Sequence, residues 1–156
     1  MIIQNMSHDD FQQIKRDITE FWGEKCNIVD ILTHPIFLHE FGNTAYVIKD
    51  NQEVVAYLLG FISQISRTAY VHMIACKPSC RRKGYVKSLY EYFINYSKSV
   101  SCTKIKAITS PNNKESIAFH QSLGMSLLGE PNDAGIQVIS NYAGPGKDRV
   151  VFEKQI

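Results

Sequence analysis

Five basic residues and no acidic residue lie within the segment Cys76–Leu89, which reads CKPSCRRKGYVKSL. Arg81, Arg82 and Lys83 directly precede Gly84. The segment follows a predicted strand and precedes a predicted helix, so backbone N–H groups and the positive end of the helix dipole would meet in one small volume. Glycine lets the backbone approach a ligand closely. These residues predict a site for a diphosphate, and a solvated basic turn is the alternative.

A second segment, Ser110–Met125, also combines polar residues with a helical pattern. Asn113, Ser116 and His120 recur at intervals of three and four residues, which places them near one face of a helix. Gly124 stands where a helix commonly ends. The spacing therefore predicts a helix from about Asn113 to Leu123 that presents polar groups on one side.

Both segments resemble the GNAT superfamily of acetyl-CoA-dependent N-acetyltransferases. The first matches the family's acyl-CoA loop, Arg/Gln-x-x-Gly-x-Gly/Ala, over Arg81–Val86. The second matches the family's helix motif at Asn113, Ser116, Phe119, His120, Gly124 and Met125. Order and spacing agree from about Thr44 to Met125, and Val86 departs from the usual Gly or Ala, where it would either crowd the pyrophosphate or pack into the helix.

The resemblance implies acetyl-CoA as acetyl donor and no metal. In the family the pantetheine arm bonds to the backbone of the strand before the loop, here Ile74, Ala75 and Cys76, and the loop wraps the pyrophosphate. The cofactor contacts that it implies are Ile74, Ala75, Cys76, Arg81, Arg82, Lys83, Gly84, Tyr85, Val86, Asn113, Ser116 and Phe119.

Two histidines are the catalytic candidates. His120 replaces the tyrosine that, in many relatives, protonates the leaving thiolate, and a histidine can do that work nearer neutral pH. His72 shares strand parity with Tyr70, Ile74 and Cys76, and family members place a base on this strand face. The alternative for His72 is a packed, hydrogen-bonded residue of the strand.

The acceptor candidates come from the two ends of the chain. Trp22, His34 and His39 lie in the helical opening that covers the acceptor site in the family. Trp22 also continues an apolar stripe, which favours a core position. Tyr142 and Asp148 belong to a Gly/Pro-rich segment that resembles the ending of some family members, and a hairpin turn is its simpler interpretation.

Several predicted elements would position these residues. Ser7 and Asp10 can cap a helix that carries Phe11, Ile14, Ile18, Phe21 and Trp22 at helical spacing, and a short helix around Ile28, Ile31 and Leu32 follows it. β-Branched and aromatic residues predict a hairpin, Thr44–Lys49 with Val54–Gln64, and a strand from Thr68 to Cys76. A helix from Gly84 to about Lys98 precedes a strand over Lys104–Thr109. The tail predicts strands over Ser126–Leu128, Ile136–Tyr142 and Arg149–Glu153.

This order predicts a mixed α/β fold of the GNAT type: a central, mostly antiparallel sheet with one parallel βαβ crossover, flanked by helices. With 156 residues, 44% of them hydrophobic and 21% charged, the chain is expected to form one domain over residues 1–156. No apolar run is long enough to cross a bilayer, and the start does not resemble a secretory signal, so we expect no membrane association and a cytoplasmic protein.

The net charge of +2 argues against a nucleic-acid footprint spread over a whole face. The four cysteines, Cys26, Cys76, Cys80 and Cys102, lack metal-ligand spacing and are interpreted as reduced thiols of the core or near the surface.

We therefore expect acetyl transfer onto a primary amine of a small molecule or peptide by direct attack, without nucleic acid as partner. The terminal strands could supply a dimer edge for a homodimer. One alternative is an inactive acyl-CoA-binding module, and another is an RNA- or phosphate-binding domain that uses Arg81, Arg82 and Lys83.

Overall fold

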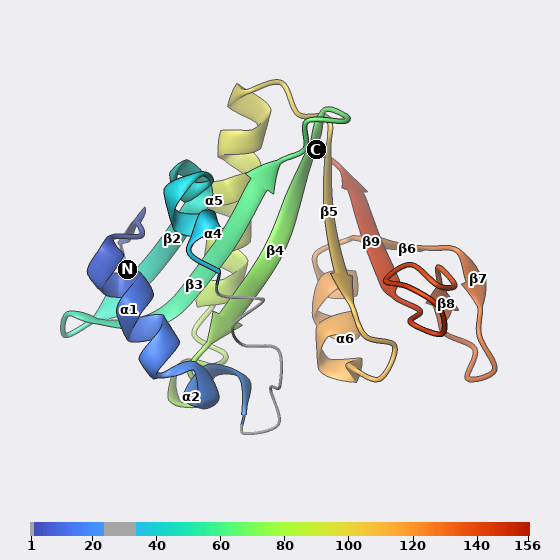
Figure 1. Ribbon diagram of the computed structural model, residues 1–156, viewed down its shortest axis with the longest axis horizontal. Helices are drawn as coiled ribbons and strands as arrows, with labels where there is room; N and C mark the ends of the chain where they lie inside the picture. Colours follow the sequence, from blue (N-terminus) through green and yellow to red (C-terminus); the bar gives the residue numbers. More distant parts are fainter. Residues whose placement is uncertain (1, 24–33) are drawn as a thin grey trace. The chain divides into compact units, whose positions relative to one another are not determined.

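The computed structural model describes residues 2–23 and 34–156 (Figure 1). They cluster into two compact units, Met1–Phe61 with Val71–Tyr96, and Ile62–Tyr70 with Ser97–Ile156. The helix predicted around Ile28, Ile31 and Leu32 lies outside the described residues, as does Cys26.

The first unit contains the sheet order β1-β2-β3-β4. Its strands are β1 (Ile3–Asn5), β2 (Ala45–Asp50), β3 (Glu53–Ile62) and β4 (Thr68–Cys76). β2 and β3 pair antiparallel with Tyr46 opposite Leu58, which confirms the predicted hairpin. β1, which pairs antiparallel with β2, has three residues and is too short to show a period in the sequence.

Between Ser7 and Trp22, where the sequence predicts one helix, the structure has two. α1 (His8–Arg16) begins with the expected capping box: the Ser7 side chain accepts from the Asp10 N–H, and the Asp10 carboxylate accepts from the Ser7 N–H. Asp17 ends α1 and starts α2 (Ile18–Trp22). The apolar side chains of both helices share a core with the sheet: Phe11, Ile14, Ile18, Phe21, Val47, Tyr57, Met73 and Ala75.

Further helices complete this unit. α4 (Ile36–His39) and the 3₁₀ turn η1 (Gly42–Thr44) precede β2, and η2 (Pro78–Cys80) follows β4. α5 (Tyr85–Ser99) packs its aromatic side chains on Tyr46, whose ring lies 4.9 Å from Tyr92 and 6.3 Å from Phe93. In Figure 1, α5 lies behind β2 and β3, and α1 lies in front of them. Among the described helices, none is long and apolar enough to cross a membrane.

The second unit carries the strand order β5-β9-β6. β5 (Lys104–Thr109), β6 (Ser126–Leu128) and β9 (Val150–Gln155) pair antiparallel through β9, and α6 (Lys114–Ser122) connects β5 to β6. β7 (Glu130–Pro131) and β8 (Gln137–Val138) form a small second sheet. The strand predicted over Ile136–Tyr142 is shorter than expected, because only β8 and a single bridge from Ile139 to Arg149 form.

The start of β4 belongs to this second unit and lies beside the start of β5. The Thr103 N–H, just before β5, donates to the carbonyl of Arg67, just before β4, over 2.9 Å. The two strands are neighbours in the sheet and run parallel, with α5 as their crossover. This pair confirms the predicted mixed α/β fold with one parallel crossover in a mostly antiparallel sheet.

Candidate functional site

The basic segment forms an exposed turn between β4 and α5. Residues Arg81, Arg82, Lys83 and Gly84 are all exposed, whereas Lys77 and Cys80 are buried. Arg82 has a φ of 63° and Gly84 a φ of 82°, so the turn passes twice through the left-handed region. Glycine is favoured at position 84, because a residue with a Cβ is strained at that φ.

α5 begins directly after this turn. The Ser88 N–H donates to the Gly84 carbonyl over 3.0 Å, which is the first hydrogen bond of the helix. The first N–H groups of a helix have no acceptor within the helix and carry a partial positive charge. The structure therefore combines a helix N-terminus with three exposed cationic side chains, a combination suited to a diphosphate. Val86 is half-buried in the first turn of α5.

Not all five basic residues of the segment belong to this exposed cluster. Lys77 is turned into the protein and pairs with carboxylates. Lys87 lies 3.9 Å from Glu91, one turn further along α5. The exposed cationic cluster is thus Arg81, Arg82 and Lys83, a small patch that suits one diphosphate better than an extended polyanion.

The cysteines of this region are buried thiols. Cys76, Cys80 and Cys102 are free and buried, which confirms the interpretation of these three residues. Burial raises the pKa of the Cys76 thiol to about 11, and the neighbouring Cys80 adds to the effect. Cys76 is therefore protonated at neutral pH and is a poor nucleophile, since the thiolate is the reactive form.

His72 lies on β4 with Tyr70 and Ile74. These three residues are half-buried, whereas Val71 and Met73 between them are buried, which agrees with the predicted strand parity. Cys76, the fourth residue predicted for this face, is buried. The imidazole stacks on the ring of Phe37 from α4, with centroids 4.1 Å apart and planes at 16°. The described contacts of His72 thus include an aromatic partner that fixes the plane of its ring.

The polar face predicted for α6 forms as expected. The Asn113 side chain accepts from the Ser116 N–H over 3.0 Å and caps the helix. The Ser116 hydroxyl lies 3.2 Å from Nδ1 of His120. Met125 N–H donates to the His120 carbonyl over 3.1 Å, and Gly124 has a φ of 73°, so the helix ends at the predicted glycine.

His120 is buried within the second unit. Its ring stacks on Phe152 of β9, with centroids 4.2 Å apart and planes at 6°. Nδ1 lies 2.7 Å from the Ser116 carbonyl, an acceptor, so Nδ1 carries the proton and donates to it. Burial lowers the pKa of His120, and the hydrogen bond to Ser116 opposes this only in part. The imidazole is therefore neutral at pH 7.

The acceptor candidates of the opening segment are exposed, and each has its own contacts. Trp22 is 37% exposed, so the core interpretation of this residue is wrong; its Nε1–H donates to the Tyr57 hydroxyl over 2.7 Å. His34 is exposed and accepts from the Ile36 N–H through Nδ1 over 3.2 Å. His39 is exposed, with its ring centroid 6.4 Å from that of His8.

The two candidates near the C-terminus lie in one turn. Asp148 accepts from the Asn141 N–H over 2.8 Å, and the Asn141 side chain accepts from Gly146 over 2.7 Å. These bonds support the hairpin-turn interpretation of Asp148. Tyr142 is 44% exposed and interacts with Tyr70, whose pKa burial raises to about 12.

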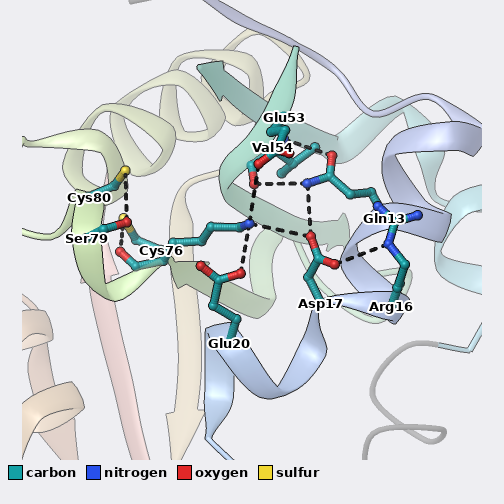
Figure 2. Close-up of polar contacts among 10 residues, drawn as sticks. Gln13, Arg16, Asp17, Glu20, Glu53, Val54, Cys76, Ser79 and Cys80 are labelled. Atoms are coloured by element: carbon teal, nitrogen blue, oxygen red, sulfur yellow. Dashed lines mark hydrogen bonds and ion pairs between the residues drawn. The ribbon is translucent and has the colours of Figure 1, made fainter. Parts of the chain in front are cut away.

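Sequence reasoning missed a polar cluster beside the turn. The Lys77 ammonium lies near the carboxylates of Asp17, Glu20 and Glu53, and Gln13 holds Asp17 in place (Figure 2). The motif around Lys77 gave no signal for this arrangement, because its partners come from distant parts of the chain.

The chain is similar to known proteins in sequence motif and in fold. Residues 8–125 match the family model described as Acetyltransferase (GNAT) family. No curated protein matches the chain. Among solved structures, a GNAT-family protein from Desulfovibrio desulfuricans is 13% identical, with a TM-score of 0.77 over 99% of this chain and 98% of that one.

Two further solved structures have stated activities. The ribosomal-protein-S18-alanine N-acetyltransferase from Escherichia coli is 15% identical, with a TM-score of 0.69 over 99% of this chain and 93% of that one. An aminoglycoside 6'-N-acetyltransferase complexed with coenzyme A is 16% identical, with a TM-score of 0.72 over 99% and 97%. At sequence identities of 15% and 16%, these structures show that the fold is shared and do not show that the activity is shared.

Proposed function

Because the chain belongs to the GNAT family of acetyltransferases, we propose that it transfers the acetyl group of acetyl-CoA to a primary amine. The observation that carries the proposal is the turn before α5, with its exposed Arg81, Arg82 and Lys83 and its left-handed Gly84. An aminoglycoside and a ribosomal-protein alanine are the acceptors named for two structural neighbours. Both support an amine of a small molecule or peptide as acceptor.

The turn and the first turn of α5 would hold the diphosphate of acetyl-CoA. Arg81, Arg82 and Lys83 supply positive charge, and the backbone N–H groups around Gly84 supply donors. The backbone of Ile74, Ala75 and Cys76 would bind the pantetheine arm. When bound, acetyl-CoA supplies the thioester carbonyl carbon that the amine attacks directly, and the CoA thiol leaves. Asn113, Ser116 and Phe119 remain cofactor contacts predicted from the family motif.

His72 is the proposed base. A protonated amine cannot attack, so a group must accept its proton, and a histidine does so above its own pKa. The Phe37 ring holds the imidazole of His72 in one plane. His72→Asn should lower turnover most at acidic pH, where fewer amines are already neutral.

His120 is the proposed acid for the leaving thiolate. Nδ1 already donates to Ser116, so His120 would have to donate from Nε2 as an imidazolium. The lowered pKa of His120 makes that form more abundant only as the pH falls. Turnover that depends on His120 should therefore decline as the pH rises, and His120→Ala should remove that part of the pH profile.

Calorimetric titration with acetyl-CoA, beside free CoA, tests the function first. We expect saturable binding near one molecule per chain, weakened about tenfold by Arg82→Glu, which corresponds to about 1.4 kcal/mol. The matched control is Arg67→Glu, an exposed arginine before β4, which should bind as the native chain does.

A thiol-release assay with polyamines, amino acids, aminoglycosides and peptide N-termini then identifies the acceptor. Absence of binding at millimolar acetyl-CoA would overturn the proposed function. Binding without acetylation of any amine would instead identify an inactive acyl-CoA-binding module.

A further inference from the structure

Lys77 is a buried lysine directly after β4. Its side chain is 9% exposed, and its Nζ lies 2.9 Å from Glu20, 3.4 Å from Asp17 and 3.8 Å from Glu53. The ring of Phe21 lies 5.7 Å from the same nitrogen. Lysine is almost never buried unless its charge is paired. The ion pairs with Asp17, Glu20 and Glu53 therefore compensate the burial of the Lys77 charge.

The carboxylates around Lys77 are held in place by a second layer of contacts. The Gln13 side chain donates to Asp17 over 3.1 Å and accepts from the Val54 N–H over 2.9 Å (Figure 2). Arg16 also contacts Asp17, over 3.3 Å. The ammonium thus joins α1 and α2 to the start of β3 and the end of β4. Hydrogen bonding and Coulomb attraction to Glu20 and Asp17 raise the pKa of Lys77 despite its burial.

The backbone of Lys77 is anchored as well. Its N–H donates to the Val55 carbonyl over 2.9 Å, and its carbonyl accepts from the Cys80 N–H over 2.9 Å. From Pro78 to Gly84 only Cys80 is buried. The exposed basic turn is therefore fastened to the protein by two buried residues, Lys77 and Cys80.

We propose that Lys77 is a positioning residue for acetyl-CoA binding. Its buried ammonium fixes Lys77, four residues before the Arg81–Gly84 turn, against α2 and the start of β3. It also offsets part of the negative charge of Asp17, Glu20 and Glu53, which without this cation would repel a diphosphate bound at the turn. This inference rests on the proposed function and adds to it a residue that does not touch the substrate.

Different substitutions separate the effect of the positive charge of Lys77 from the effect of its ion pairs on the position of the turn. Lys77→Met keeps much of the aliphatic stem and leaves the carboxylates without their cation. Lys77→Arg restores a cation, although its planar guanidinium fits three carboxylates less well than an ammonium. Adding Glu20→Gln to Lys77→Met removes one of the carboxylates that would repel the diphosphate, but it does not restore the ion pairs that hold Lys77 in place. Lys98→Met, at an exposed lysine in the last turn of α5, is the control.

The measurements are the dissociation constant of acetyl-CoA and steady-state kinetics, with urea unfolding to establish that each variant is folded. We expect Lys77→Met to weaken binding at least about tenfold, equivalent to about 1.4 kcal/mol. KM for acetyl-CoA should rise while kcat at saturation changes less than about twofold. Lys77→Arg should recover most of the affinity, the double variant should lie between, and Lys98→Met should match the native chain.

Native affinity in a folded Lys77→Met chain would overturn the inference. If Lys77→Met does not fold, the test uses the double variant Lys77→Met with Glu20→Gln, which removes both members of the Lys77–Glu20 ion pair. Weakened acetyl-CoA binding by the double variant supports the inference, and native affinity overturns it. A native chain that binds no acetyl-CoA would overturn the proposed function itself. The two failures are therefore distinguishable.

Discussion

Two histidines of the chain are each stacked on a phenylalanine ring, His72 on Phe37 and His120 on Phe152. Stacking fixes the orientation of an imidazole, and burial decides which protonation state it holds. For His120, burial lowers the pKa and favours a neutral ring, and the hydrogen bond from Nδ1 to the Ser116 carbonyl opposes this only in part. His120 is therefore part of the core of its unit as well as a candidate acid.

The lowered pKa of His120 gives a pH-dependent stability. The unfolded chain protonates this residue near its ordinary pKa of 6.5, whereas the folded chain resists protonation to lower pH. The stabilisation is thus present above about pH 6.5 and is lost as the pH falls, with a slope of up to about 1.4 kcal/mol per pH unit.

Urea unfolding of the native chain and His120→Asn at pH 7.5 and 5.5 measures this effect. The variant should be less stable at pH 7.5, because it loses the stack on Phe152, but its stability should fall less on acidification. His8→Asn, at an exposed histidine, should keep the native pH dependence. An equal fall in the native chain and His120→Asn would contradict the prediction.

At the scale of elements, the ends of helices α1 and α6 are determined by residues that lie at or next to those ends. Ser7 and Asp10 start α1, Asn113 starts α6, and Gly124 ends it. Each of these works through backbone groups within three or four residues. Such signals are visible in sequence, and the predicted bounds of both helices begin where the structure has them.

Gly129, between β6 and β7, is an element boundary that depends on a distant strand. Its φ is 93°, and a Cβ built there would overlap the backbone carbonyl of Val138 in β8. Gly129→Ala should therefore destabilise the protein by about 3 kcal/mol or more, from left-handed strain and a backbone clash together.

Gly146→Ala is the matched control for this substitution. Gly146 has a φ of 68°, and a Cβ there would meet nothing within 4 Å. Only the conformational strain should remain, about 1 kcal/mol. Urea unfolding measures both variants, and equal losses would show that the Val138 carbonyl can move aside.

At the scale of the whole molecule, the net charge is only +2, so the attraction of an anion must come from local charge. Arg81, Arg82 and Lys83 provide it, while Lys77 is paired with carboxylates. Anion binding should therefore depend on this one turn rather than on the overall charge of the protein.

Binding of acetyl-CoA should stabilise the folded chain. At a ligand concentration one hundred times Kd, linkage predicts about 2.7 kcal/mol, or a rise in Tm of roughly 5 to 10 °C. Thermal unfolding monitored by circular dichroism measures the rise. Added salt should reduce it by screening the exposed cations. Pantetheine, which lacks the diphosphate, should give little rise; an equal rise would assign the stabilisation to another part of the ligand.

The sequence by itself determined what depends on residues close together in the chain. The hairpin, the strands Thr68–Cys76 and Lys104–Thr109, the helix caps and the basic turn all follow from local periodicity, capping and turn chemistry. The family motifs, which are also local, identified the cofactor candidates. The sequence did not show that the first helix ends at Asp17 and a second begins there, because the apolar residues keep helical spacing across this point. It did not show β1 either, because three residues are too few for an alternating pattern.

Only the tertiary structure decided which of these residues are buried, paired or neutral. Lys77 looks like one more cation of the turn until its ammonium is seen against Asp17, 60 residues away in sequence. Trp22 continues an apolar stripe and yet is exposed, and His120 is neutral because Phe152 and its surroundings bury it. Solvation and charge pairing depend on contacts between distant residues, which local spacing does not encode.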